Sequence, residues 1–205
     1  MITQTKDSRS YLTPEDVLEI LKSGNRRFIE KDFVSRDFAL QIEETARGQF
    51  PYAVILSCID SRVPTEIIFD QGIGDVFCIR VAGNVVNSDV IGSLEFSCKV
   101  AGAKLVLVLG HTSCGAIKGA CDDVNLGELT GLLDKIKPSI NKVVEQGDRT
   151  SKNLSFVNRV AETNVDVMKN LIRKKSPILQ ELELSKEVLF VGGMYSVETG
   201  EVNFF

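Results

Sequence analysis

The chain has 205 residues, of which 43% are hydrophobic and 25% are charged, and its formal net charge is −4. This composition is that of an ordinary globular protein, and the acidic balance argues against non-specific binding of nucleic acid. No apolar run reaches the length of about 20 residues that a membrane-spanning helix needs. Five cysteines without a paired spacing favour a reducing cytoplasm. We therefore expect a cytoplasmic protein that binds neither nucleic acid nor membranes.

The first quarter of the chain has a helical pattern over residues 14–47. Thr13 is a candidate N-cap, and Pro14 followed by two acidic residues suits the first turn of a helix. Gly24 and Gly48 are expected to break the helical run. We expect one domain, residues 1–205, made of an N-terminal helical arm (1–48) and an α/β core (49–205) that carries the functional site.

The rest of the chain alternates between strand and helix patterns. Short apolar runs that do not alternate with polar residues are typical of parallel strands buried on both faces, and they cover residues 52–57, 75–81, 104–109 and 187–191. Helical patterns cover residues 88–100, roughly 126–145, and 154–174. The sequence thus predicts an α/β fold with a mostly parallel central sheet flanked by helices. Residues 195–205 predict a turn and an antiparallel edge strand.

Polar side chains follow the first and third predicted strands. Cys58 comes directly after the first strand and is followed by Asp60 and Arg62, whereas His111 and Cys114 follow the third. Because ligands bind outside the carboxyl ends of strands in open α/β sheets, we expect these side chains to converge at one edge. His111 is the only histidine of the chain, so any chemistry that needs an imidazole must use it.

Two thiolates and one imidazole are zinc ligands, and they leave the fourth position of the metal open. Structural zinc sites are closed by four protein ligands, whereas catalytic sites keep one position for water. We therefore predict one zinc ion per chain on Cys58, His111 and Cys114. Zinc with an open position lowers the pKa of water and yields hydroxide near neutral pH.

Asp60 and Arg62 can assist this chemistry as a pair. Arginine and a carboxylate often bond through two parallel hydrogen bonds, which fix the orientation of the acid. Held in this way, Asp60 can accept the proton of zinc-bound hydroxide and direct the oxygen lone pair at a substrate. Released from Arg62, Asp60 is close enough to become a conditional fourth zinc ligand in a closed state. The alternative is that the pair only satisfies a buried turn.

Four segments together resemble the β-class carbonic anhydrases, and the resemblance covers most of the chain. They are residues 53–64 (AVILSCIDSRVP), 69–77 (FDQGIGDVF), 80–84 (RVAGN) and 110–116 (GHTSCGA). The resemblance implies reversible hydration of carbon dioxide to bicarbonate and a proton through zinc-bound hydroxide. It also implies that Asp60 and Arg62 gate the zinc, and that the protein is a homodimer or a higher homo-oligomer with active sites at the subunit interface.

Four further residues match substrate-pocket positions of the family. Gln49 matches the glutamine that helps hold substrate in the plant-type branch, and Phe77 matches an aromatic residue of the pocket. Ala82 matches a small apolar wall residue, and the backbone amide of Gly115 matches an oxyanion donor. The resemblance is therefore to the plant-type-like branch, for which we expect an open zinc site at neutral pH.

Two positions depart from related branches. Phe96 stands where plant-type enzymes have tyrosine, and Ile55 stands where the bicarbonate-regulated branch has tryptophan, a residue that this chain lacks. Two other functions remain open from the sequence. One is a zinc hydrolase of a related small electrophile such as carbon disulfide or carbonyl sulfide, and the other is a non-catalytic zinc-binding scaffold.

Overall fold

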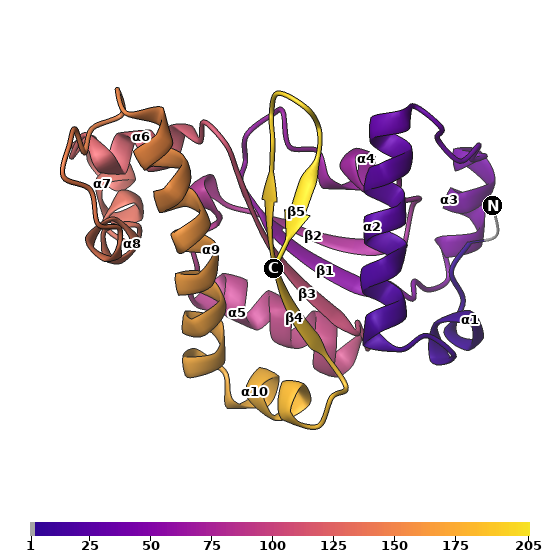
Figure 1. Ribbon diagram of the computed structural model, residues 1–205. Coiled ribbons are helices and arrows are strands. Elements are labelled where there is room, and N and C mark those ends of the chain that lie inside the picture. The colour runs from indigo at the N-terminus through magenta and orange to yellow at the C-terminus, as the bar shows by residue number, and fades with distance from the viewer. Residues whose placement is uncertain (1–2) are drawn as a thin grey trace.

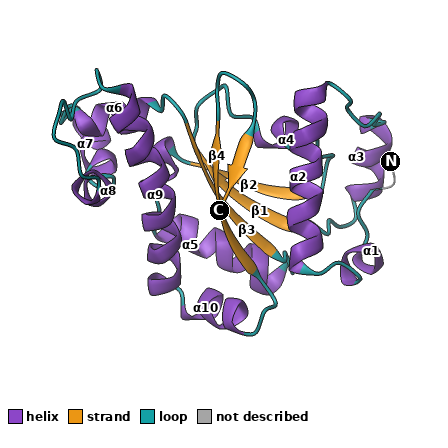
Figure 2. Cartoon of the chain, viewed as in Figure 1, coloured by secondary structure: helices purple, strands orange, loops and turns teal. Residues whose placement is uncertain are grey.

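A computed structural model describes residues 3–205 and shows a five-stranded sheet with helices on both faces (Figures 1 and 2). The strands follow the order β2-β1-β3-β4-β5. Neighbouring strands from β2 to β4 are parallel, and β5 pairs with β4 in the antiparallel direction. The predicted mostly parallel sheet with an antiparallel edge strand is thus confirmed. The strands are β1 (Ala53–Ser57), β2 (Val76–Arg80), β3 (Leu105–His111), β4 (Leu189–Tyr195) and β5 (Val202–Phe204).

The helices cover the two faces of the sheet, and three of them, α1 to α3, precede the first strand. They are α1 (Lys6–Ser10), α2 (Pro14–Glu30), α3 (Phe38–Thr45), α4 (Thr65–Ile68), α5 (Ser88–Glu95), α6 (Gly115–Cys121), α7 (Gly127–Leu133), α8 (Lys137–Lys142), α9 (Leu154–Lys175) and α10 (Pro177–Leu184). Two further helical segments are a 3-10 turn, η1 (Ala82–Asn84), and a π-helical turn, η2 (Phe96–Val100). Among the described residues, none of these helices is both long and apolar enough to cross a membrane.

The expected helix break at Gly24 is wrong, because α2 continues through it to Glu30. A Cβ atom on Gly24 would lie 1.8 Å from the carbonyl oxygen of Phe69, so glycine serves close packing here. The helix ends instead at Lys31, whose φ of 60° is left-handed. Its start agrees with the sequence, since the Thr13 side chain accepts a hydrogen bond from the Asp16 amide.

The expected helix over 126–145 is also wrong, since two short helices, α7 and α8, occupy that segment. Pro138 lies in the first turn of α8, where its missing amide proton costs nothing, whereas inside a longer helix it would remove a hydrogen bond. Four further helices, α1, α4, α6 and α10, do not follow from the sequence pattern, because they are too short to show a clear helical period. The segment 88–100 is helical but changes from α5 to the π-helical η2.

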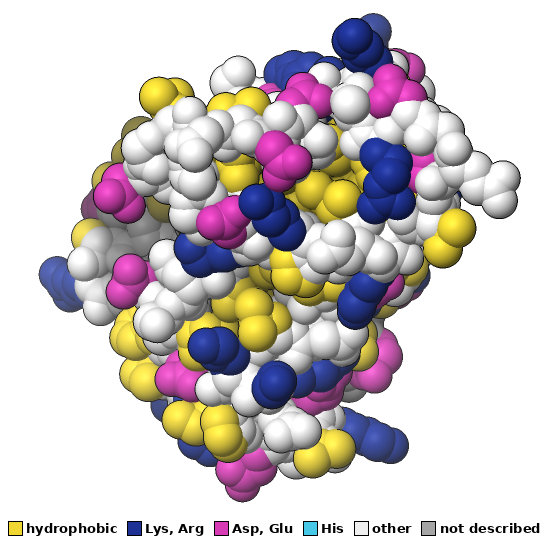
Figure 3. Space-filling model, turned by 90° about the vertical axis from the view of Figure 1, so that its left-hand side faces the viewer, with side chains coloured by type: hydrophobic (Ala, Val, Ile, Leu, Met, Phe, Trp, Pro, Cys, Tyr) yellow, Lys and Arg dark blue, Asp and Glu magenta, His cyan; other side chains and the backbone are white. Residues whose placement is uncertain are grey.

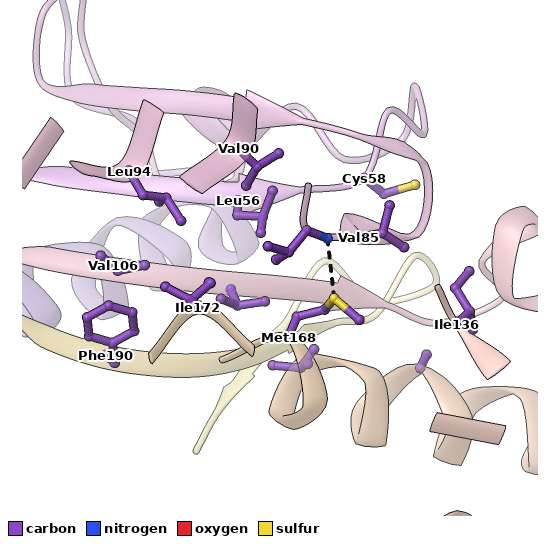
Figure 4. Packing of buried hydrophobic residues seen from close by; sticks show 14 of the residues in the cluster. Leu56, Cys58, Val85, Val90, Leu94, Val106, Ile136, Met168, Ile172 and Phe190 are labelled. Atoms are coloured by element: carbon purple, nitrogen blue, oxygen red, sulfur yellow. Dashed lines mark hydrogen bonds between the residues drawn. The ribbon is translucent and has the colours of Figure 1, made fainter. Parts of the chain in front are cut away.

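Helices bury both faces of the sheet, which explains why the strand sequences are apolar runs. Every residue of β1 and β3 is buried, whereas most of the edge strand β2 is half-buried. On one face, Val17 and Leu21 of α2 pack with residues such as Ile55. On the other face, α5, α9 and α10 cover a second cluster that includes Leu56. Figure 4 shows this second cluster, with Cys58 at one end of it.

Candidate metal centre

The ends of two neighbouring strands bring three metal-binding side chains together. Cys58 directly follows β1, and His111 is the last residue of the adjacent strand β3. Cys114 is the N-cap residue of α6. Their ligand atoms all lie within 4.8 Å of one another, and the two Sγ atoms are 4.0 Å apart. All three side chains are buried, so the convergence predicted from the strand ends is present.

The histidine already has the tautomer that a metal ligand needs. Nδ1 of His111 lies 2.9 Å from the carbonyl oxygen of Thr112, and because a carbonyl can only accept, Nδ1 carries the proton. Nε2 is therefore an acceptor, and it is buried without a hydrogen-bond partner. Buried polar atoms are normally paired. A zinc ion between the sulfurs and Nε2 would supply the missing partner. The hydrogen bond from Nδ1 to the Thr112 carbonyl oxygen would then orient the imidazole toward the metal.

The two thiols face an electrostatic conflict that a cation would resolve. The hydrogen bond from Cys114, helped by the one from the backbone amide of Gly83, lowers the pKa of Cys58. That same hydrogen bond, together with burial and the nearby Cys58 charge, raises the pKa of Cys114. Both thiolates can form together when a divalent metal compensates the second charge. The donor set thus fits zinc, with two sulfur ligands and one nitrogen ligand.

Asp60 and Arg62 form the bidentate pair that the sequence suggests. Nε of Arg62 donates to Oδ1 at 2.9 Å, and Nη2 donates to Oδ2 at 2.8 Å. The Arg62 amide also donates to Oδ1. These hydrogen bonds, led by the guanidinium, hold the pKa of Asp60 well below its usual range. Oδ2 lies 3.9 Å from Nε2 of His111, so the carboxylate faces the metal centre while it is bound to arginine.

A neighbouring arginine braces the first metal-binding loop. Arg80, at the end of β2, donates from Nε to the carbonyl oxygen of Cys58 at 2.9 Å and from Nη2 to that of Asp60 at 2.6 Å. Arg80 begins the motif at residues 80–84, and the motif alone indicates no role for it. The register that pairs Ser57 with Arg80 is what places the guanidinium beside this loop.

The second metal-binding loop is held from both sides. The Thr112 amide donates to the carbonyl oxygen of Tyr195 at 2.9 Å. Ser113 has a left-handed φ of 57°, and its amide donates to Oδ1 of Asn158 on α9 at 2.9 Å. Left-handed backbone is uncommon for residues other than glycine, so these contacts stabilise the turn between His111 and Cys114. The role of Asn158 does not follow from the sequence, because no short motif marks this residue.

A pocket of about 260 Å³ opens beside Cys58. Ala82 and Gly115, two of the expected pocket residues, line it together with Asp60. The pocket wall also includes two leucines of the α7 helix, Leu129 and Leu133, which the sequence analysis missed. The amide of Gly115 lies in the first turn of α6, where backbone amides lack partners within the helix. The pocket is thus apolar on one side and offers hydrogen-bond donors on another.

Gln49 and Phe77 are not among the residues that line this pocket. Gln49 is exposed and precedes β1, whereas Cys58 follows it. The strand Ala53–Ser57 separates them by roughly 16 Å at the usual rise per residue. Phe77 pairs in register with Val54, near the start of β1, and its ring contacts Phe96, with a centroid separation of 6.2 Å. Both residues therefore lie away from the metal ligands of their own chain.

The sheet and the donor set define an α/β zinc-thiolate protein. The family model described as carbonic anhydrase matches residues 53–202. The chain is 35% identical over 196 residues to carbonic anhydrase 2 of Mycobacterium tuberculosis, which covers 91% of this chain and 90% of that protein. It is 32% identical over 196 residues to the carbonic anhydrase of Mycolicibacterium smegmatis, with 92% of each covered. The chain belongs to the carbonic anhydrase family.

Solved structures of β-carbonic anhydrases share the fold. The chain superposes on the β-carbonic anhydrase CcaA with a TM-score of 0.72 and 22% identity, covering 92% of this chain and 87% of that one. The Coccomyxa enzyme, crystallised with acetazolamide, gives a TM-score of 0.71 and 23% identity, covering 91% and 83%. The resemblance to the β class that the motifs suggested is thus confirmed, and zinc is the metal of the centre.

Proposed function

We propose that this chain catalyses the reversible hydration of carbon dioxide to bicarbonate and a proton. The observation that carries the proposal is the buried cluster of Cys58, His111 and Cys114, with no fourth protein ligand in it among the described residues, next to a small pocket. When bound there, zinc supplies the Lewis acid that makes hydroxide available near neutral pH. A binding site closed by four protein ligands would favour a structural role instead.

The residues around the pocket have different roles in the proposed reaction. Asp60, oriented by Arg62, accepts a hydrogen bond from the attacking hydroxyl and directs its lone pair at the carbon of the substrate. The ionised state that this role needs is favoured, because the guanidinium lowers the pKa of Asp60. The Gly115 amide donates to the oxygen that gains negative charge. Ala82 provides an apolar wall for the uncharged substrate.

Asp60 is also the candidate fourth ligand of a closed state. Its Oδ2 atom lies 3.9 Å from Nε2 of His111 while both carboxylate oxygens stay bonded to Arg62. Rotation of the Asp60 side chain away from Arg62 would shorten the path to the metal. We propose that the pair with Arg62 keeps the centre open at neutral pH.

Gln49 and Phe77 require a second subunit if they are to contact substrate. Both lie near the N-terminal end of β1, whereas the metal ligands of the same chain lie at the C-terminal ends of β1 and β3. Phe77 and Phe96 belong to the edge strand β2 and to η2, and Phe96 is 54% exposed. An edge strand and an exposed aromatic residue suit a subunit interface. We propose a homodimer or higher homo-oligomer in which Gln49 and Phe77 complete the partner's pocket.

Several observations support the remaining assignments. Residues 1–205 are proposed to act as one domain, because α2 buries Val17 and Leu21 against the sheet of the core. All five cysteines are unpaired, as expected in a reducing cytoplasm. On the side that carries α6 to α9, Lys and Arg alternate with Asp and Glu (Figure 3), which does not suit a nucleic-acid groove.

The alternative substrates, carbonyl sulfide and carbon disulfide, would use the same metal centre. A relative named carbonic anhydrase at 35% identity over 91% of the chain favours carbon dioxide over them. Stopped-flow hydration of carbon dioxide by the zinc-loaded protein, followed with a pH indicator, tests the proposal, with carbonyl sulfide as the competing substrate. We expect turnover of carbon dioxide to be much faster. Hydrolysis of carbonyl sulfide without hydration of carbon dioxide would overturn the assignment, and activity toward neither would favour the scaffold.

A further inference from the structure

A buried chain of hydrogen bonds connects helices α8 and α9 to the sulfur of Cys58. The Ser139 hydroxyl donates to Oδ1 of Asn164 at 2.9 Å, and Nδ2 of Asn164 donates to the carbonyl oxygen of Gly83 at 2.9 Å. The Gly83 amide in turn donates to Sγ of Cys58 at 3.3 Å. Ser139 and Asn164 are both 0% exposed. The last acceptor of this chain is a ligand of the metal centre.

Asn164 is out of place in the face of α9 that covers the sheet. Its neighbours on this face are buried and apolar, among them Val160, Ala161, Val165 and Met168. An amide in such surroundings costs free energy unless its polar atoms are paired. The orientation of the amide is determined, because the Gly83 carbonyl can only accept and so faces Nδ2. Both ends of the amide are thus used, and one of them reaches the turn η1.

Gly83 transmits the contact because its backbone conformation is special. Its φ of 64° lies in the left-handed region, and a Cβ atom would lie 2.9 Å from Cδ1 of Ile136. The carbonyl group that Asn164 holds and the amide that faces Cys58 flank the same Cα atom. Fixing the carbonyl in this conformation therefore also fixes the direction of the amide. Without Asn164, the turn could relax and the amide could move away from the sulfur.

We propose that Asn164 is a positioning residue of the metal centre, which holds Gly83 so that its amide donates to the Cys58 thiolate. A hydrogen bond to a thiolate withdraws electron density from sulfur, and hydrogen bonds to metal-bound sulfur are one way in which proteins tune a metal. Asn164 thereby orients Cys58 and limits its donation to the metal. The inference rests on the proposed zinc centre, and it adds a residue that touches neither metal nor substrate.

The test uses Asn164→Leu, which keeps a branched side chain of related shape and removes both hydrogen bonds. The readout is the sulfur-to-cobalt charge-transfer band of the cobalt-substituted protein, together with zinc affinity measured against a chelator. We expect the band to move to lower energy, because sulfur without the amide bond releases electrons more easily. Zinc affinity should fall by about 10–100-fold, because Cys58 loses the backbone contact that orients its sulfur, and this loss outweighs the stronger electron donation.

Two matched variants separate positioning from mere packing. Val165→Ala removes buried volume from the same helix and should lower thermal stability while it keeps the band and the zinc affinity. Ser139→Ala removes the first hydrogen bond of the chain but leaves the bond from Asn164 to Gly83, so the band should stay in place. The proposal is wrong if Asn164→Leu has the wild-type band and zinc affinity, or changes them no more than Val165→Ala does.

A measurement on the unmodified sequence covers the case in which Asn164→Leu does not fold. In the cadmium-113 protein, the Gly83 amide proton should show a scalar coupling to the metal through the sulfur of Cys58. Its absence, with cadmium bound, would overturn the proposal. Failure of the wild-type protein to bind cobalt or cadmium at all would instead refute the metal centre, so the two failures are distinguishable.

Discussion

Arg62 holds both carboxylate oxygens of Asp60, with donor–acceptor distances of 2.9 Å and 2.8 Å, while Asp60 faces the metal-binding histidine. The same carboxylate can thus either assist catalysis or bind the metal, and Arg62 decides between these states. This relationship makes Arg62 a position where activity and metal content should separate.

We expect Arg62→Ala to lower kcat/KM by at least about 100-fold, or about 2.7 kcal/mol, with zinc retained. The physical reason is that the freed carboxylate can close the metal centre. Arg62→Lys keeps the charge but lacks the planar fork, so it should recover only part of the activity. Stopped-flow kinetics and metal analysis of the same preparations check this. Wild-type kcat/KM in Arg62→Ala would reduce the pair to a structural turn.

Gln49→Ala should lower kcat/KM more than tenfold, about 1.4 kcal/mol, without loss of zinc. The location of Gln49 before β1 and of Cys58 after it further predicts that the glutamine acts on the partner's metal centre. Mixed dimers of Gln49→Ala and His111→Ala chains test this, because only such a mixture would contain one complete site. Activity of the mixture above that of either parent supports action across the interface. No gain on mixing, with subunit exchange shown, would place Gln49 elsewhere.

Asp70 should make stability depend on acid pH. It is buried between Arg27 and Arg36, with side-chain exposure of 1%. Burial alone would raise its pKa, but hydrogen bonds from both arginines outweigh burial and hold the pKa below its ordinary value. A lowered folded-state pKa stabilises the protein above the unfolded value of about 4, and this contribution is lost as pH falls through the folded-state pKa.

Asp70→Asn should therefore lower the free energy of unfolding at pH 7 by about 3–5 kcal/mol, because it removes the buried charge that pairs with the half-buried Arg27 and Arg36. The variant should also lose less stability than the wild type as the pH falls below about 4, the unfolded-state pKa of the carboxylate. Urea unfolding at several pH values measures both effects. Asp134→Asn, at an exposed ion pair with Lys137, should change little. Parallel pH curves for Asp70→Asn and wild type would contradict the account.

Two glycine substitutions should differ in sign. Gly24→Ala places a methyl group 1.8 Å from the Phe69 carbonyl oxygen, so we expect a loss of about 1–3 kcal/mol or more in unfolding free energy. Gly131→Ala, inside the exposed part of α7, meets nothing within 4 Å and should be neutral or stabilise by about 0.4–1 kcal/mol. Thermal unfolding of both variants decides whether close packing explains Gly24. Equal effects would show that helix propensity alone explains it.

The sequence predicts much of this architecture because its strongest signals are local. The apolar runs that became β1 and β3 are buried on both faces, and the polar residues after them are close in space because parallel strands end at one edge. The helix break predicted at Gly24 is wrong, because a glycine that allows close packing and a glycine that breaks a helix look the same in sequence. Short helices such as α6 and α10 give too few turns to establish a period.

The outer contacts of the metal centre could not be predicted in the same way. Arg80, Asn158 and Asn164 act through hydrogen bonds to backbone groups far away in sequence. Such bonds depend on strand register and on how α9 packs, which a single sequence does not display. Asn164 can still be noticed in the sequence pattern, because it interrupts the apolar face of α9. A polar residue on an otherwise apolar helix face is therefore a signal for a buried hydrogen bond.

The most direct test is a zinc titration of the metal-free protein with carbon dioxide hydration followed at each point. We predict that activity rises in proportion to bound zinc and reaches its maximum at one zinc per chain, because Cys58, His111 and Cys114 form one centre. His111→Ala should bind zinc weakly and stay inactive throughout. One zinc bound per wild-type chain without faster hydration than the buffer alone, or full activity in His111→Ala, would contradict the account.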